Sequence, residues 1–341
     1  MKEENVIPVN SGKRLAYFDT LKCLGILLVI SGHVQFFGMN IKAYDSPPTL
    51  MLYSFNMPLF FFISGYLAFK EDMIGNMKGV RKTGNKFQYL VLPAIVFYVF
   101  SSLLEQGGNI FGFFEYGLGK YWFTFTLFEM FMIYYCVISL IKSKTGLAIS
   151  LILLSISGLC YLNFFSKYDI AFFDFNHLMK YFQFFTLGVL SKMYFPLYDK
   201  VMRSEWIKAT SIILFFTILF MLYKITLPNI VHHLLRDIVL RYLGLYIVVS
   251  LFYCKQEIFS KDNRINSIIQ NIGKNSLAIY LLQYFFMPDF SGYPQWLKSL
   301  DWLSIYAISF GYTVFITALC MLFIYLLSNS TFVKKYALGK R

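Results

Sequence analysis

The sequence predicts an all-α polytopic membrane protein, a bundle of about ten transmembrane helices. Hydrophobic residues make up 57% of the 341 residues, aromatic residues 20% and charged residues only 14%. The mean hydropathy of +0.57 is also positive, so most of the chain is expected to be surrounded by lipid. Apolar runs of about 20 residues, each long enough to cross a bilayer as a helix, recur along the whole chain.

The apolar runs follow one another with short polar connections. They begin near Leu15, Leu50, Phe87, Tyr121, Gly146, Lys180, Ile207, Asp237, Ser276 and Trp302. The ninth run, which extends through Met287, is short for a spanning helix. The first run is longer than a signal-peptide core and has no small-residue cleavage site after it, so we expect it to be retained as a helix. The chain shows no internal repeat and no long linker, so residues 1–341 are expected to form a single membrane domain.

The basic residues are distributed unequally between alternate connections. If both termini are cytoplasmic, 22 of the 31 Lys and Arg residues lie on that side, as the positive-inside rule requires. They occupy segments 2–14, 70–86, 142–144, 192–208, 255–274 and 334–341. The net charge of +13 therefore reflects topology, and the dispersed basic residues do not indicate nucleic-acid binding. We expect a multi-pass protein of the inner or plasma membrane, in contact with membrane lipid.

Three charged or basic side chains, Asp19, Lys22 and His33, lie within the first run. At about 100° per residue, the eleven steps from Lys22 to His33 amount to roughly three turns plus 20°. Both side chains should therefore project from one face of a helix, about 16 Å apart along its axis. Asp19 precedes Lys22 by three residues and can pair with it. His33 is expected about 27 Å along a hydrocarbon core of roughly 30 Å, near the non-cytoplasmic surface.

Ionisable groups are costly within a membrane, so these three residues are candidates for a functional site. A neutral imidazole has an intrinsic pKa near 6.5 and can act as a general base. Structural interpretations also stay open. Lys22 could extend its amino group to the nearby cytoplasmic surface, Asp19 could merely neutralise Lys22, and His33 could be an ordinary interfacial residue.

Five stretches of the chain together resemble one known family. They are RLAYFDTLKCLGILLVISGH at 14–33, SFNMPLFFFISGYL at 54–67, KYWFTFTLFEMF at 120–131, YFQFFTLGVLSK at 181–192 and NSLAIYLLQYFF at 275–286. In this order they resemble the membrane-bound acyltransferase family 3, whose bacterial members O-acylate cell-surface polysaccharides and related glycans. A basic residue followed after ten residues by a histidine, here Lys22 and His33, is the family's first signature.

The chain departs from the family's pattern at two places. Members often carry a pair of basic residues at the cytoplasmic mouth of the third helix, but Thr83 occupies the expected first position and only Lys86 fits the second. Gln283 stands where relatives often have histidine, and the role of this residue is left open.

The resemblance implies transfer of an acyl group, with acetyl expected, from a cytoplasmic coenzyme A thioester to a hydroxyl of a cell-surface or lipid-linked glycan. His33 would act as the base or would itself be acylated, and we favour direct transfer. Acetyl-CoA would thread its pantetheine arm into the bundle, while cationic side chains hold its phosphates and adenine end. The candidates for this role are Arg14, Lys22, Arg81, Lys82 and Lys86, with Asp19 orienting Lys22.

Other features leave alternatives open. Glu129 and Arg241 lie at membrane depth, where they could form an ion pair or contact substrate. A transporter or glycan exporter without acyl chemistry, or an inactive assembly subunit, would also have many spans and buried charges. The five cysteines are scattered without metal-ligand spacing, so no metal site is expected. The acceptor and the oligomeric state cannot be read from the sequence.

Overall fold

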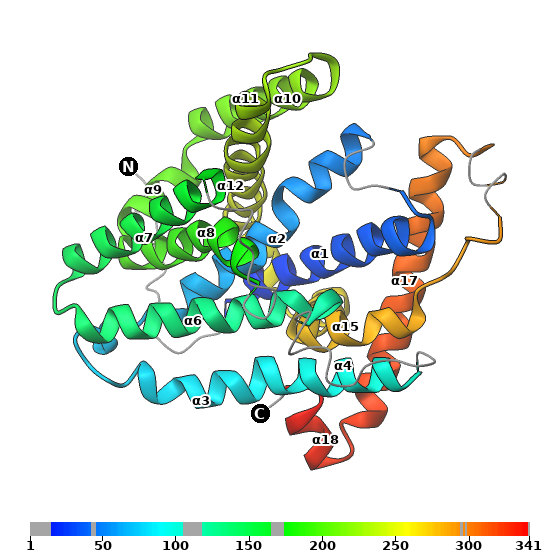
Figure 1. Cartoon of the computed structure of the whole chain (residues 1–341), viewed down its shortest axis with the longest axis horizontal. Helices are drawn as coiled ribbons and strands as arrows, with labels where there is room; N and C mark the ends of the chain where they lie inside the picture. The colour runs from blue at the N-terminus through cyan, green and yellow to red at the C-terminus, as the bar shows by residue number, and fades with distance from the viewer. Residues whose placement is uncertain are drawn as a thin grey trace.

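The computed structural model describes residues 15–41, 46–104, 118–164, 174–293, 296 and 299–339, and this part of the chain is helical, with no strand. Its main helices, all of them long except the ninth, occupy the ten predicted runs (Figure 1). They are α1 (Ala16–His33), α2 (Pro47–Ala68), the stretch formed by α3 (Thr83–Lys86), η4 (Phe87–Val91) and α4 (Leu92–Leu104), α6 (Trp122–Leu140), α7 (Lys144–Phe164), α8 (Phe175–Met193), α10 (Glu205–Lys224), α12 (Leu240–Cys254), α15 (Ser276–Leu282) and α17 (Trp302–Leu327).

Eight helices within the described ranges are long and apolar enough to span a membrane, which confirms the predicted fold class. The other two predicted runs differ in kind. Helix α8 has 19 residues but falls outside this set, because polar side chains such as His177, Lys180 and Gln183 lower its hydropathy. The ninth run forms a continuous helix only over Ser276–Phe286, about 17 Å of rise, so it is too short to cross a bilayer unaided.

The short helices connect the spans. They are η1 (Val34–Gly38), η2 (Glu71–Met73), η3 (Val80–Lys82), η5 (Gly119–Tyr121), α9 (Phe195–Arg203), α11 (Asn229–Leu234), η7 (Leu235–Val239), α13 (Gln256–Ser260), α14 (Arg264–Lys274), η8 (Gln283–Phe286) and α18 (Thr331–Tyr336).

Helices α1, α2 and α6 lie largely inside the bundle. More than half of the most apolar stretch of each is buried, against 28% for α7, α10 and α17. In Figure 1, α1 runs through the middle, with α10 and α12 on one side of it and α3 and α4 on the other. The peripheral helices expose large apolar side chains, as expected for surfaces that face lipid.

Two glycines allow α2 and α8 to cross closely. A Cβ atom added at Gly65 would lie 2.0 Å from the carbonyl oxygen of Phe185, and one added at Gly188 would lie 2.0 Å from that of Phe62. Small residues permit such close approach of helix backbones in membranes. Gly65 therefore has a packing role.

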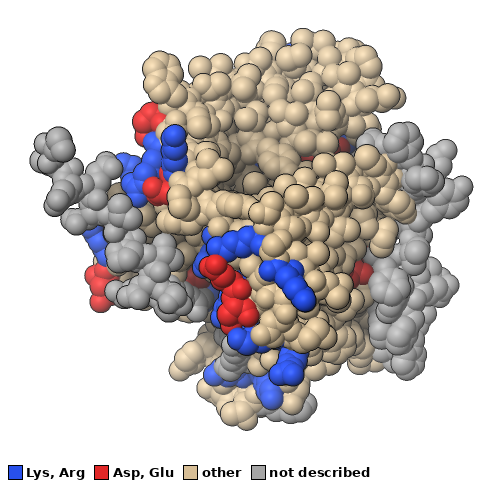
Figure 2. All heavy atoms as spheres, turned by 90° about the vertical axis from the view of Figure 1, so that its left-hand side faces the viewer, with Lys and Arg blue, Asp and Glu red and all other residues tan. Residues whose placement is uncertain are grey.

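Charged side chains gather on one end of the bundle. Figure 2, which faces the left-hand side of Figure 1, shows Lys, Arg, Asp and Glu clustered there beside a broad uncharged surface. The ion pairs Lys144–Glu71, Lys78–Asp72 and Arg203–Asp199 belong to connections at this end. We call this the basic end. It is the end where α1 begins, and it is the side that the charge distribution predicts to be cytoplasmic.

Candidate active site

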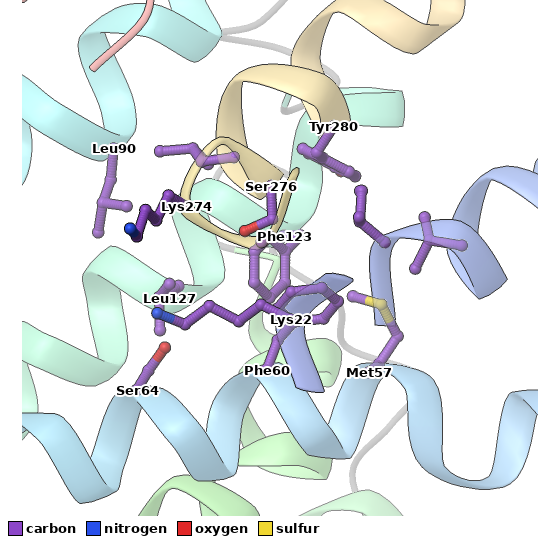
Figure 3. Close-up of a pocket in the computed structure, with 14 residues that line it drawn as sticks. Lys22, Met57, Phe60, Ser64, Leu90, Phe123, Leu127, Lys274, Ser276 and Tyr280 are labelled. Atoms are coloured by element: carbon purple, nitrogen blue, oxygen red, sulfur yellow. The ribbon is translucent and has the colours of Figure 1, made fainter. Parts of the chain in front are cut away.

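A cavity of about 200 Å³ lies between α1, α2, η4, α6, α14 and α15 (Figure 3). Most of its wall is apolar, and it includes Ile26 and Val29 of α1, Phe60 of α2 and Phe123 of α6. The polar side chains on the wall are Lys22, Ser64, Lys274, Ser276 and Tyr280. Figure 3 shows the amino groups of Lys22 and Lys274 on the same side of the cavity as the Ser64 hydroxyl. The cavity thus has a cationic side and an apolar interior.

Lys22 is held by the acidic residue that the sequence places beside it. The Lys22 Nζ atom lies 3.7 Å from Oδ1 of Asp19, which confirms the predicted pair. The Asp19 side chain is almost fully buried, and that of Lys22 is 23% exposed. The pair therefore holds the Lys22 amino group beside a buried carboxylate at the cavity wall.

The α1 side of the cavity follows one helical stripe. Lys22, Ile26 and Val29 line it at spacings of four and three residues, and His33 follows Val29 by four. Because α1 is a regular helix through His33, the predicted common face of Lys22 and His33 is confirmed. His33 itself does not line the cavity. The cavity therefore extends from Lys22 toward His33 and ends one turn short of it.

Aromatic rings and an amide surround the His33 imidazole. Its ring centroid lies 5.2 Å from that of Tyr284 and 5.4 Å from that of Phe37. Gln283, which is fully buried, neighbours the imidazole, and its Nε2 atom donates to the backbone oxygen of Tyr280 at 3.1 Å. Neither the buried Nδ1 atom of His33 nor the Oε1 atom of Gln283 has a hydrogen-bond partner among the described residues. Two unsatisfied polar atoms beside each other leave acceptor capacity for a bound hydroxyl group or water.

The backbone changes form directly after His33. Residues Val34–Gly38 form a π-helix, and such insertions occur often at functional sites. Gln35 lies in this segment, and both polar atoms of its 2%-exposed side chain lack a partner among the described residues. The sequence does not predict this irregularity, because no Gly or Pro stands at the start of the segment.

Two tyrosines of the short ninth helix form hydrogen bonds to the backbone just before α6. The hydroxyls of Tyr280 and Tyr284 both donate to the backbone carbonyl of Lys120, at 2.7 and 2.8 Å. Tyr280 lines the cavity and Tyr284 packs on His33. The ninth helix therefore contributes one tyrosine to the cavity wall and another to the surroundings of the imidazole.

Arg81, Lys82 and Lys86, the other described candidates for donor binding, are not on the cavity wall. Arg14 lies outside the described residues. Arg81 is exposed, and Lys82 and Lys86 are half-buried. The Nζ atom of Lys86 sits 3.5 Å from the centroid of the Phe131 ring. Leu90, one turn beyond Lys86, does line the cavity, so this segment leads to the cavity without contributing its basic groups to the wall.

The two charged residues at membrane depth do not pair with each other. Arg241 lies 2.9 Å from Asp237, one turn away on the same helical segment, so the suggested Glu129–Arg241 ion pair is wrong. Glu129 is 4% exposed, and its Oε2 atom has no hydrogen-bond partner among the described residues. Within the described ranges no group of three or more His, Cys, Asp and Glu side chains could hold a metal ion.

The sequence patterns did not indicate Lys274 and Tyr280, which lie in and beside the stretch NSLAIYLLQYFF. Helical periodicity cannot relate them to α1, because they belong to other helices. A signal was present, however: a basic residue directly before an apolar run marks a membrane surface, and Lys274 is in that position.

Comparison with known proteins assigns the chain to a family. No curated protein and no solved structure gave a match. The model of a family described as an acyltransferase domain matches residues 15–328, which include all ten predicted runs. The chain therefore belongs to acyltransferase family 3, and it is an integral membrane acyltransferase.

Proposed function

We propose that this protein transfers an acetyl group from cytoplasmic acetyl-CoA to a hydroxyl of a cell-surface or lipid-linked glycan, with His33 as the general base. The observation that carries the proposal is the cavity along α1. It begins at the Asp19–Lys22 pair, has an apolar wall, and ends one turn before His33.

In this reaction the imidazole of His33 removes the proton of the glycan hydroxyl group while the hydroxyl oxygen attacks the thioester carbonyl carbon. The carbon–sulfur bond then breaks, and coenzyme A leaves as a thiolate that takes up a proton. The unpartnered Nδ1 of His33 and the neighbouring Gln283 favour this role, because a bound hydroxyl can pair with them.

The donor would occupy the cavity with its pantetheine arm along the apolar wall. Its phosphates would remain at the basic end, near Lys22, and Arg14, Arg81, Lys82 and Lys86 would add positive charge there. Since coenzyme A thioesters are made in the cytoplasm, the basic end would face the cytoplasm. The acceptor would then approach His33 from the opposite side of the inner or plasma membrane.

The test is transfer of radiolabelled acetyl groups from acetyl-CoA to native surface glycan in membranes that contain the protein. We expect label in glycan with wild type and its loss with His33→Ala at equal protein level. His232→Ala, which changes another histidine away from the cavity, should keep wild-type transfer. Transfer that survives His33→Ala would place the base elsewhere. No transfer by wild type, with acceptor and other acyl donors tested, would favour a transporter.

A further inference from the structure

We propose that Lys274 binds the phosphate groups of coenzyme A at the mouth of the cavity. This inference rests on the proposed function, and it assigns a donor-binding role to a residue on a different helix from Lys22. The evidence is the position of Lys274, its charge environment and the shape of the cavity.

Lys274 is held in place by an unusually close contact between α14 and α1. It is the last residue of α14, and the preceding Gly273 packs on the first turn of α1. A Cβ atom added at Gly273 would lie 1.8 Å from the backbone oxygen of Asp19. Only glycine permits this approach, which brings Lys274 to the cavity wall that Lys22 also lines.

Among the described residues, nearby carboxylates do not balance the positive charge at this end of the cavity. Asp19 pairs with Lys22, whereas Lys274 takes part in none of the ion pairs found among the described residues. Two lysines thus face one carboxylate at the cavity mouth. Phosphates carry several negative charges and are stabilised by charge-assisted hydrogen bonds from more than one cation.

Exposure separates the two lysines along the cavity. Lys274 is exposed, whereas the Lys22 side chain is mostly buried. Both amino groups lie on the side of Ser64, away from Tyr280 (Figure 3). A ligand with a charged head and an apolar arm would therefore place its head at Lys274 and its arm along Ile26 and Val29.

A lysine in the last turn of a helix can also act structurally, because it stabilises the negative end of the helix dipole. That role would affect the stability of the protein and would not distinguish ligands with phosphates from ligands without them. The experiment therefore compares coenzyme A with pantetheine, which has the same arm but no phosphates.

The measurement is isothermal titration calorimetry on the full-length protein in lipid nanodiscs. We expect Lys274→Gln to weaken coenzyme A binding by about tenfold, since one charge-assisted contact is lost, and to leave pantetheine affinity unchanged. Lys274→Arg should retain the affinity. Lys255→Gln removes another exposed lysine at a helix end, outside the cavity wall, and should have no effect. Thermal unfolding of each variant reports its folding.

Equal weakening of both ligands by Lys274→Gln, or unchanged coenzyme A affinity, would overturn the inference while leaving the proposed function intact. If wild type bound coenzyme A no more tightly than pantetheine, Lys274 would have no phosphate to bind and the inference would fail. If wild type bound neither ligand and transferred no acetyl group, the proposed function would fail with it.

Discussion

Asp19, Lys22 and His33 could be related to one another from the sequence because a single helix carries all three. Helical geometry fixes the direction of each side chain within α1, so the pair and the common face followed from spacing alone. Lys274 reaches the same cavity from a distant part of the chain. No periodicity connects two separate helices, so this part of the site required the tertiary structure.

The Asp19–Lys22 pair makes a prediction about stability and donor affinity. Asp19→Asn leaves Lys22 without the carboxylate that orients it in a largely buried position. We expect a loss of about 1–2 kcal/mol in the free energy of unfolding and a several-fold rise in KM for acetyl-CoA. Chemical denaturation and steady-state kinetics measure the two effects.

Asp72→Asn is the matched control, because it breaks an exposed ion pair with Lys78 at the same end of the bundle. It should leave both the free energy of unfolding and KM close to their wild-type values, because an exposed ion pair is screened by water and contributes little to stability. Equal effects of the two substitutions would contradict the assigned role of Asp19.

At the scale of the elements, the short ninth helix has the largest influence on the site. Its length was evident from the sequence, since the apolar run is interrupted soon after Phe286. The attachment of this helix to the start of α6 was not evident from the sequence. The hydroxyls of Tyr280 and Tyr284 donate to the carbonyl of Lys120, which belongs to the backbone of another segment. Side-chain patterns do not show which backbone groups will be shared.

The shared carbonyl predicts a non-additive effect of removing the two phenol hydroxyls. Tyr280→Phe and Tyr284→Phe should each cost less than about 0.5 kcal/mol, because the other hydroxyl still satisfies the carbonyl oxygen. The double variant should lose about 1–2 kcal/mol. Thermal unfolding in detergent measures the stability of the two single variants and the double variant. The control is Tyr325→Phe, which alters a 72%-exposed tyrosine of α17. Additive losses would show that the two bonds act separately.

At the scale of the whole molecule, composition and run length predicted the all-α membrane fold and the order of its helices. They could not show which helices form the interior, because α7 and α17 are more apolar than α2 yet less buried. In lipid, hydropathy does not distinguish a helix that faces lipid from one that faces other helices. The position of the cavity between α1, α2 and α6 therefore came only from the structure.

The charge distribution predicts the orientation of the bundle. In a cysteine-free background, Lys142→Cys between α6 and α7 should resist a membrane-impermeant maleimide in intact cells. Thr226→Cys, in the exposed connection after α10, should react. Both should react after the cells are permeabilised, which shows that each site is accessible. The reverse pattern in intact cells would place the basic end outside and would separate the cavity mouth from cytoplasmic acetyl-CoA.

In the proposed function, one face of α1 would carry the donor-binding and the proton-accepting groups as separate parts. The most direct measurement is steady-state acetyl transfer by purified protein in nanodiscs, with His33→Gln and Lys22→Gln compared with wild type. His33→Gln should lower kcat by about 10²- to 10⁴-fold with little change in KM for acetyl-CoA. Lys22→Gln should mainly raise KM. A His33→Gln protein that keeps kcat within tenfold of wild type would show that His33 is not the general base.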